Sequence, residues 1–293
     1  MDNQHTFIQR RQMFEQDYFK RVDDNILRSI TVVDLSTTDF CNRTCVFCPR
    51  HDPKVYPNRS LHMTSQGAEI IASKLSDIDF KGTVAISGFG ENLINPNIVE
   101  IIRVLRRKLP DAFIECNTNG DPLKSLLASQ LIDMGLDCIN INLYDGPEQV
   151  QKFDLMLQHI PKEKYKYRVH WGDEDFGLHY NNRSGVVKWI PYKNNEVMKG
   201  CYYPFYKLFV DWNGDVLFCA NDWGRENVIG NLMQQTIDEL WLSSAMKKIR
   251  TQLATKGRII TPCNSCNING GMVGKLSFNR FMEFYEKEDT GNG

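Results

Sequence analysis

The sequence predicts an α/β protein built around a parallel sheet. From about residue 30 to residue 190, short apolar runs of strand character alternate with longer segments of helical periodicity, a pattern typical of βα units. Three of the helical segments follow a proline that commonly marks a helix start, at Pro96, Pro122 and Pro147. The 293 residues suffice for one large domain, or for one domain with a smaller companion.

The elements follow one another in a regular order. A polar, partly amphipathic helical lead-in is expected over residues 1–29. Strands are then expected at residues 30–36, 83–87, 112–116, 138–143 and 165–170, with a sixth at residues 186–190. Helices are expected between them, at residues 65–75, 97–109, 122–134 and 148–159.

Composition indicates a cytoplasmic protein that binds neither nucleic acid nor membrane. A net charge of −1 gives no attraction to nucleic acid or to an anionic membrane surface. Hydrophobic residues make up 42% of the chain, yet no apolar stretch approaches the roughly 20 residues of a membrane span. The first residues, from Met1 to His5, lack the charged and apolar regions of a signal peptide.

The nine cysteines indicate metal or redox chemistry, because disulfide frameworks belong to exported proteins. By position they form a group of three, a group of four and two isolated residues. The groups are Cys41, Cys45 and Cys48; then Cys201, Cys219, Cys263 and Cys266; and last Cys116 and Cys138.

The group of three lies in a Cys-x3-Cys-x2-Cys loop directly after the first predicted strand. Thiolates are the preferred ligands of iron–sulfur clusters, and three of them leave one iron of a four-iron cluster without a protein ligand. A structural zinc ion is the alternative, but it requires four ligands and the loop supplies no fourth.

This loop resembles the cluster loop of the radical S-adenosylmethionine (SAM) superfamily, which also has an aromatic residue, here Phe47, before its last cysteine. The resemblance implies that the open iron binds the amino and carboxylate groups of SAM. One electron then cleaves SAM to methionine and a 5′-deoxyadenosyl radical. It also implies a partial (β/α)6 TIM-like barrel, with the chemistry at the carboxyl ends of the strands.

Two further segments resemble SAM-binding loops of that superfamily. Gly88, Gly90 and Glu91 follow the second predicted strand and match its Gly-Gly-Glu-Pro segment, in which Phe89 here replaces the second glycine and Asn92 the proline. The third strand ends in Asn117-Thr118-Asn119-Gly120, where Asn117 and Asn119 match positions that line SAM in relatives. Simple turns are the alternative, because asparagine and glycine are common turn residues.

The C-terminal third has a different pattern. Residues 207–219 read as a hairpin with an Asn-Gly turn, and a helix is expected from residue 236 to about residue 256. The four cysteines follow the spacing Cys-x17-Cys-x43-Cys-x2-Cys, and Cys-x2-Cys pairs often bind structural zinc. The arrangement resembles the twitch domain, a shorter relative of the SPASM domain, which implies one auxiliary 4Fe–4S cluster. Because four cysteines leave no iron open, we expect this cluster to carry electrons.

These observations predict four segments. They are a helical lead-in at 1–29, a radical SAM partial barrel at 30–190, a twitch or SPASM-like domain at 191–275 and a C-terminal tail at 276–293 that is expected to fray.

The resemblance extends to the twitch-domain dehydrogenases that act on aminocyclitols. It implies removal of a hydrogen atom from a carbinol carbon, transfer of the remaining electron to the auxiliary cluster, and a ketone product. The substrate would be a small sugar or aminocyclitol, and a flavodoxin or ferredoxin would supply reducing electrons. Arg183 lies where it could reach a hydroxyl or the SAM carboxylate, although an ordinary surface salt bridge would also explain it.

Three other functions remain open. Redox-neutral epimerisation would need a thiol to return a hydrogen atom, and Cys116 and Cys138 are the cysteines available for it, although inert packing in strands also suits them. Peptide modification is disfavoured because no recognition segment is seen. A cluster-bearing binding or electron-carrier module without catalysis is disfavoured by the SAM-binding segments.

Overall fold

The computed structural model describes residues 4–171, 181–190 and 200–290, and it confirms the α/β class. The described residues form one eight-stranded sheet in the order β5-β4-β3-β2-β1-β6-β7-β8. Its first six strands are parallel neighbours, and β7 and β8 continue it as antiparallel strands. The strands are β1 (Val32–Leu35), β2 (Thr83–Ile86), β3 (Phe113–Thr118), β4 (Cys138–Leu143), β5 (Tyr165–Val169), β6 (Lys207–Val210), β7 (Asp215–Leu217) and β8 (Val228–Asn231).

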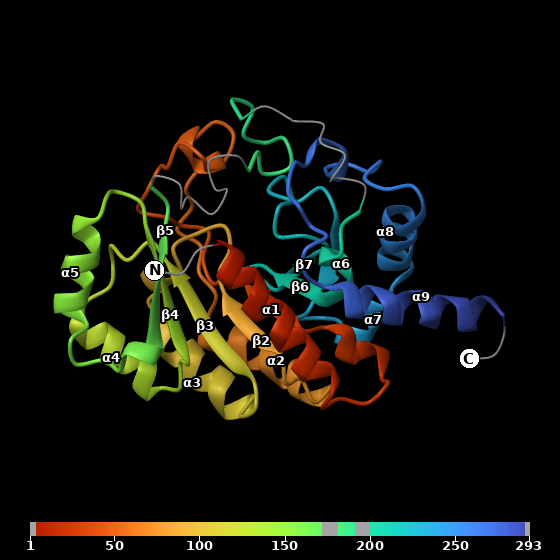
Figure 1. Ribbon diagram of the computed structural model, residues 1–293, viewed down its shortest axis with the longest axis horizontal. Coiled ribbons are helices and arrows are strands. Elements are labelled where there is room, and N and C mark those ends of the chain that lie inside the picture. Colours follow the sequence, from red (N-terminus) through yellow and green to blue (C-terminus); the bar gives the residue numbers. More distant parts are fainter. Residues whose placement is uncertain (1–3, 172–180, 191–199, 291–293) are drawn as a thin grey trace.

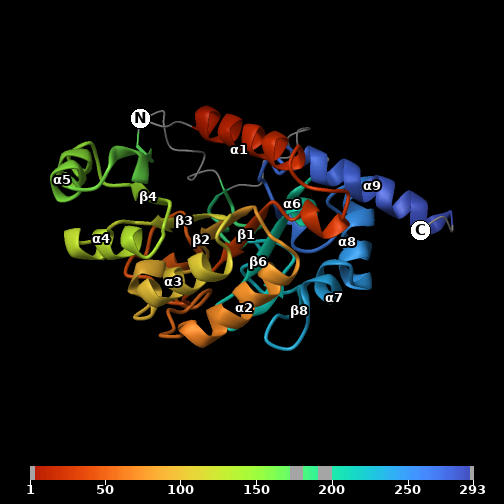
Figure 2. The same ribbon diagram turned by 90° about the horizontal axis from the view of Figure 1, so that it is seen from below.

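Helices lie on both faces of this sheet. Figures 1 and 2 show α2 and α3 against one face, and α1 with α9 on the opposite side. The helices are α1 (Gln4–Phe19), α2 (Ser65–Asp77), α3 (Ile98–Lys108), α4 (Ser125–Asp133), α5 (Glu148–Met156), α6 (Tyr203–Tyr206), α7 (Ile237–Trp241), α8 (Ser244–Thr255) and α9 (Lys275–Asp289). Among the described helices, none is long and apolar enough to cross a membrane.

The two faces of the sheet differ sharply in polarity. Because successive side chains of a strand point to opposite faces, Val33 and Leu35 enter the apolar core while Asp34 between them faces the other way. Strand pairing places Asp34 beside Ala85, and Ala85 beside Glu115. The partial barrel therefore has an apolar outside covered by helices and a polar inside.

The sixth strand is not where the sequence predicted it. Residues 186–190 form turns, and the sixth parallel strand is β6, which pairs with β1. The apolar residues of segment 186–190 pack against the first cysteine loop instead of entering the sheet. Val187 and Ile190 are buried against Phe47 of that loop. The first strand of the hairpin predicted at residues 207–219 is therefore the sixth parallel strand of the barrel sheet. The proposed domain boundary at 190/191 adjoins residues 191–199, which lie outside the described residues, and it stays a prediction.

The C-terminal segment is helical and packed, so the expectation of a fraying tail at 276–293 was wrong over its described part. Phe281 of α9 is fully buried and lies 6.0 Å from the ring of Trp241. The helix predicted over 236–256 is in fact two helices, α7 and α8. They separate at Ser243, whose hydroxyl accepts a hydrogen bond from the amide of Met246 and caps α8.

Candidate functional site

The first cysteine loop leaves the carboxyl end of β1 and is held by backbone contacts. The amide of Cys48 donates to the carbonyl of Cys45 at 2.9 Å. The side chain of Asn58 accepts from the amide of Cys41 at 2.8 Å and donates to its carbonyl at 2.6 Å. The three cysteines are partly exposed and line one open cavity of about 670 Å³ at this end of the barrel.

A buried ion cluster fixes the base of this loop. Asp39 is fully buried, and its carboxylate binds Arg50 at 2.7 Å and Arg59 at 2.9 Å. The hydroxyl of Tyr56 donates to the same carboxylate at 3.0 Å. Because removing one partner would leave an uncompensated buried charge, this cluster keeps the loop in one conformation.

Burial keeps the first cysteines in the thiol form as long as no metal is bound. It raises the pKa of Cys45 to about 11, and it raises the pKa of Cys41 and of Cys48 as well. A thiol becomes a ligand only after losing its proton, and a bound metal supplies the compensating charge. These side chains are therefore suited to hold a metal group rather than to act as free nucleophiles.

The two glycines after β2 are required by close backbone approach. A Cβ at Gly88, where φ is +144°, would lie 2.5 Å from the Cβ of Ser36. A Cβ at Gly90 would lie 2.4 Å from the carbonyl oxygen of Thr38. The turn thus presses against the start of the cysteine loop, and the amide of Glu91 donates to the carbonyl of Phe40 at 2.8 Å.

Glu91 is a buried carboxylate on the wall of the large cavity. It accepts hydrogen bonds from the hydroxyl of Thr118 and the amide of Asn119, both at 2.7 Å, and from the amide of Leu93 at 3.2 Å. Burial raises its pKa to about 7, against the lowering effect of these donors. A cation placed beside Glu91 would therefore stabilise its ionised form.

The two predicted asparagines lie on the same cavity wall. The side-chain amide of Asn119 donates to Asn42 at 2.9 Å and approaches the sulfur of Cys41 at 4.0 Å. The side chain of Asn117 accepts from the guanidinium of Arg168 at 2.8 Å. The structure therefore brings together Phe47, Gly88, Gly90, Glu91, Asn117, Asn119 and the three cysteines.

Phe89, which departs from the superfamily pattern, connects the two halves of the molecule. Its ring is 2% exposed and lies 4.6 Å from Trp223, 4.9 Å from Phe209 and 5.9 Å from Tyr56, measured between ring centroids. The guanidinium of Arg225 lies 4.8 Å from its centroid. A glycine here would leave a hole between the turn after β2 and the C-terminal hairpin.

Arg225 reinforces this connection with charge. It binds Asp211, which follows β6, at 2.6 Å and hydrogen-bonds the hydroxyl of Tyr56. It also lies 3.7 Å from Asp39. Phe89, Tyr56, Trp223, Arg225 and Asp211 are called the inter-region clamp below.

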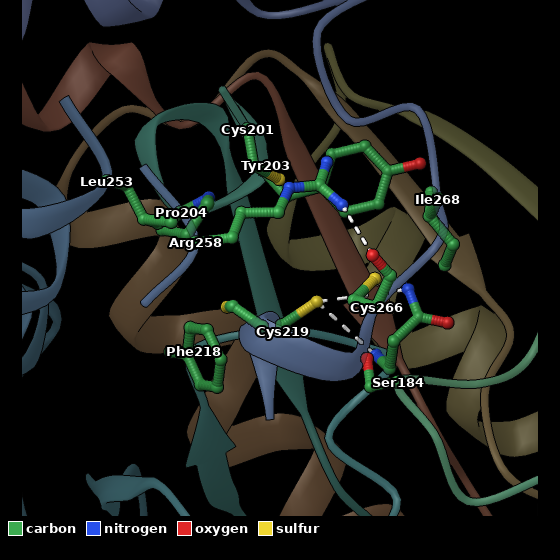
Figure 3. Close-up of a pocket in the computed structure, with 12 residues that line it drawn as sticks. Ser184, Cys201, Tyr203, Pro204, Phe218, Cys219, Leu253, Arg258, Cys266 and Ile268 are labelled. Atoms are coloured by element: carbon green, nitrogen blue, oxygen red, sulfur yellow. Dashed lines mark hydrogen bonds between the residues drawn. The ribbon is translucent and has the colours of Figure 1, made fainter. Parts of the chain in front are cut away.

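The second cysteine set is assembled from three separate segments. Cys201 precedes α6, Cys219 follows β7, and Cys263 and Cys266 lie in a short turn after α8. All four line one small cavity with apolar walls, and Figure 3 shows the sulfurs of Cys201, Cys219 and Cys266 directed into the same space. The amide of Asn221 donates to the sulfur of Cys219 at 3.4 Å.

Burial also favours the protonated form of three of these thiols. It raises the pKa of Cys263 to about 12 and that of Cys201, and it raises the pKa of Cys219 well above its ordinary value. In the part of the chain that the structure describes, no three His, Cys, Asp or Glu side chains converge as closely as one bound metal ion requires. All four cysteines line the same cavity, and thiolates are the preferred ligands of iron–sulfur clusters.

A thin wall separates the two cavities. Tyr203, Asn221 and Ile268 line both the large cavity and the second cysteine cavity. Tyr203 is partly exposed, and its ring appears beside the cysteines in Figure 3. A group in the large cavity can therefore lie one side chain away from the second cysteine set.

Arg183 lies on the wall of the large cavity, and no salt bridge joins it to another described residue; its reach to a hydroxyl or to the SAM carboxylate stays a prediction. Its Nε is buried and has no hydrogen-bond partner among the described residues. Both Arg183 and Ser184 have positive φ, of 49° and 56°, which costs backbone strain. Asn182 secures this conformation by donating from its side chain to the carbonyl of Ser265 at 2.7 Å.

The sequence reasoning missed the ion pairs inside the barrel. Lys207 binds Asp34 at 2.7 Å, Arg11 of α1 pairs with Glu115, and all four residues line the large cavity. A charged residue inside an apolar strand, as in Val32-Val33-Asp34-Leu35, is the signal that could have revealed them.

The two isolated cysteines are packed away from this cavity. Cys116 faces the apolar core with no exposed surface, and Cys138 is 1% exposed, its thiol 3.8 Å from the side-chain oxygen of Asn140. Neither is among the described residues that line the large cavity.

Comparison with protein-family models gives two matches. Residues 35–170 match the radical SAM superfamily, and residues 201–267 match SPASM, an iron–sulfur cluster-binding domain. The first match runs from the end of β1 through β5 and includes the first cysteine loop, and the second covers all four cysteines of the second set.

Curated relatives are similar over different shares of the chain. A SAM-dependent 2-deoxy-scyllo-inosamine dehydrogenase of Niallia circulans is 26% identical over 81% of this chain and 92% of its own length. A probable GTP 3′,8-cyclase of Methanocaldococcus jannaschii is 34% identical over 41% of this chain and 38% of its own length.

Solved structures give the same picture. BtrN in complex with AdoMet and 2-DOIA superposes with a TM-score of 0.71 at 25% identity, over 82% of this chain and 93% of that chain. Native anSMEcpe with bound AdoMet has a TM-score of 0.53 at 12% identity, over 89% of this chain and 99% of that chain, and shows a shared fold.

Proposed function

Since the chain is a member of the radical SAM superfamily with a SPASM domain, we propose that it oxidises a secondary alcohol of a small sugar or aminocyclitol to a ketone. The similarity to the 2-deoxy-scyllo-inosamine dehydrogenase over nearly the whole of that enzyme supports the reaction type. The cofactors of this reaction are SAM and two 4Fe–4S clusters.

We assign one cluster to each cysteine set. Cys41, Cys45 and Cys48 hold the SAM-binding cluster, and Cys201, Cys219, Cys263 and Cys266 hold the auxiliary cluster. When bound and reduced, the first cluster with SAM supplies the 5′-deoxyadenosyl radical that abstracts a hydrogen atom. The donor set fits, because three sulfurs open onto a large cavity while four sulfurs enclose a small one.

The residues beside the first set position SAM. The carboxylate of Glu91 receives the SAM ammonium, because it is buried and faces the cavity. Phe47 is buried beneath the loop against Tyr144, at 5.4 Å between ring centroids, and keeps water from the cluster. Gly88 and Gly90 let the turn after β2 pack against Ser36 and Thr38, which places its backbone on the wall that faces the cofactor. Asn117 and Asn119 offer amides to its polar atoms.

Arg183 binds an oxygen of SAM or of the substrate. Its guanidinium carries a permanent charge. Its Nε is buried, and its side chain lines the large cavity. Burial lowers its pKa, and the nearby Cys48, Tyr144, Tyr203 and Cys266 oppose this change. Arg183 lines the large cavity, and the next residue, Ser184, lines the second cysteine cavity. Arg183 acts as a hydrogen-bond donor and not as the acceptor of a proton.

The shared wall is the single observation that carries the dehydrogenase proposal. Tyr203 and Asn221 line both cavities, so a carbinol in the large cavity lies next to the place where an electron acceptor is held. An epimerase would instead need a thiol facing the substrate, and Cys116 and Cys138 are packed in the sheet. Oxidation therefore suits the arrangement better than epimerisation.

A protein that works in this way needs an external one-electron donor. We propose a flavodoxin or ferredoxin in this role and a cytoplasmic location, where a reducing environment preserves thiols for cluster assembly.

The test is an anaerobic incubation with SAM, reductant and ring-deuterated polyols in ordinary water. The panel contains 2-deoxy-scyllo-inosamine, scyllo-inositol and glucose. We expect deuterium in 5′-deoxyadenosine and one ketone per 5′-deoxyadenosine formed. A product epimer carrying one hydrogen from solvent would contradict dehydrogenation and support the epimerase alternative.

A further inference from the structure

Oxidation of a carbinol removes a hydrogen atom from carbon, one electron, and a proton from the hydroxyl oxygen. That proton needs an acceptor. The cavity wall offers few candidates. Arginine side chains stay protonated in proteins, so Arg11, Arg43, Arg50, Arg168 and Arg183 cannot serve. Burial raises the pKa of Tyr144 and of Tyr203 far above neutrality, so their phenols are protonated at neutral pH. Among the described residues that line the cavity, three carboxylates remain.

Two of the three carboxylates are occupied by the protein. Glu91 accepts three hydrogen bonds from Thr118, Asn119 and Leu93, and it stands at the cofactor end of the cavity. Glu115 pairs with Arg11, and its pKa is lowered because Arg11 and Arg168 outweigh the opposite effect of burial. Neither has the freedom to receive a substrate proton.

The third carboxylate, Asp34, has a different environment. One oxygen binds the ammonium of Lys207 at 2.7 Å, while the partner of the other among the described residues is the hydroxyl of Ser87, at a long 3.4 Å. The side chain of Asp34 is 6% exposed and lines the large cavity. Its neighbour across the strand pair is Ala85, a small residue that also lines the cavity and leaves room for a ring above the sheet.

Asp34 also lies on the side of the cavity that faces the second cysteine set. Lys207 connects it to Tyr203, because its ammonium lies 5.3 Å from the centroid of that ring. Tyr203 belongs to the wall shared by both cavities. A carbinol hydroxyl at Asp34 therefore places its carbon beside the wall across which the electron must leave.

We propose that Asp34 accepts the hydroxyl proton of the substrate and that Lys207 positions its carboxylate. This inference rests on the dehydrogenase function proposed above. The substrate O–H bond breaks, its electron pair stays on the oxygen, and a new O–H bond forms on Asp34. The hydroxyl of a carbon radical is more acidic than that of the parent alcohol, so the transfer follows loss of the hydrogen atom. The remaining electron passes to the auxiliary iron–sulfur cluster, and Asp34 returns its proton to water between turnovers.

The decisive variant is Asp34→Asn, which keeps the shape of the side chain but removes its basicity. The probe is the ring-deuterated panel compound that the wild type oxidises. We expect deuterium still to enter 5′-deoxyadenosine while ketone formed per 5′-deoxyadenosine falls by about 100-fold or more, the usual contribution of a general base. Equilibrium binding of the same compound, measured with SAM and without reductant, should change by less than about tenfold because one neutral hydrogen bond replaces a charged one.

Ser87→Ala is the matched control, because it removes the other polar partner of Asp34 and leaves the carboxylate in place. It should retain ketone formation near the wild-type ratio. Lys207→Gln should lower the ratio less than Asp34→Asn does, and it keeps the inference testable if Asp34→Asn fails to fold or to bind iron. An unchanged ratio of ketone to 5′-deoxyadenosine in Asp34→Asn, or in Lys207→Gln if only that variant folds, would overturn the inference. An epimer from the wild type would overturn the function on which it rests.

Discussion

The two cysteine sets differ in how the chain builds them. The first set lies within eight residues of one loop, opens onto a cavity of about 670 Å³ and stands next to an exposed residue, Val46. The second set is gathered from segments 65 residues apart at their extremes, and apolar side chains such as Phe218 and Leu253 enclose it. Three sulfurs face an open space, and four surround a closed one.

We propose that this difference separates a site for binding from a site for storage of an electron. A cluster with an open iron must admit SAM and substrate, so its loop needs polar walls and an entrance. A fully ligated cluster needs a fixed position and a dry surrounding, because hydrogen bonds to sulfur and burial set its potential. The inter-region clamp joins the two regions through the ring contact of Phe89 with Trp223 and the ion pair of Arg225 with Asp211.

The largest effects should come from removing one cysteine of each set. We expect Cys48→Ala to reduce formation of 5′-deoxyadenosine by more than about 100-fold, since even indirect ligand partners contribute 10- to 100-fold to metal sites. We expect Cys219→Ala to keep SAM cleavage and to lose the ketone. Both products are measured by chromatography after anaerobic turnover. Equal loss of 5′-deoxyadenosine in both variants would remove the distinction between the sites.

A smaller change should loosen the connection between the two regions. Phe89→Ala removes a buried ring, and such truncations cost about 3–5 kcal/mol of the free energy of unfolding. Phe89→Leu keeps most of the volume and should cost about 1.5 kcal/mol or less. Denaturant titration of the two variants measures the contrast. Equal stability of Phe89→Ala and wild type would show that the ring does not hold the regions together.

The mildest effect is the pH dependence of SAM binding at the first site. Burial raises the pKa of Glu91 to about 7, so the folded protein without SAM holds this proton up to near neutral pH. A SAM ammonium favours the ionised carboxylate, so affinity should rise as pH increases through about 7. Between pH 6 and pH 8 the dissociation constant should fall about tenfold, as expected for one proton released on binding. Calorimetry checks this, and Glu91→Gln is the control whose weaker binding should show no such slope.

The same linkage applies to stability, with the opposite sign. Because the folded-state pKa of Glu91 lies above its unfolded value of 4.5, its stabilising contribution is complete below pH 4.5 and is lost as pH rises toward 7. SAM binding should therefore compensate for instability that the buried carboxylate causes at neutral pH.

The alternation of strand-like and helical segments predicted the parallel sheet correctly, because these segments carry strong local periodicity. The sixth strand was misplaced because Val186-Val187 and Leu208-Phe209 are equally apolar, and only tertiary contact decides which joins β1. The tail at 276–293 was misread for a similar reason. Its helix is stabilised by packing of Phe281 against Phe205 of α6 and against Trp241, partners that lie far away in the sequence.

The same distinction between local sequence patterns and distant contacts applies to the candidate site. Short cysteine spacings and Gly-x-Gly-Glu predicted residues that the structure brings onto one cavity wall, because those residues are neighbours in the sequence. The pair of Asp34 and Lys207 was missed, since its members are 173 residues apart and meet only through the pairing of β1 with β6. Likewise, the sequence could not reveal that Phe89 joins the two regions, because its contact with Phe209 of the C-terminal hairpin depends on the fold.

The most direct test is the iron, sulfide and zinc content per chain after anaerobic purification of the wild type and of Cys263→Ala/Cys266→Ala. We expect about eight irons in the wild type and about four in the double variant, as two independent 4Fe clusters require. About four irons and one zinc in the wild type, with iron unchanged in the variant, would contradict the assignment. The enclosed site would then be structural, and the proposed dehydrogenase would have no electron acceptor.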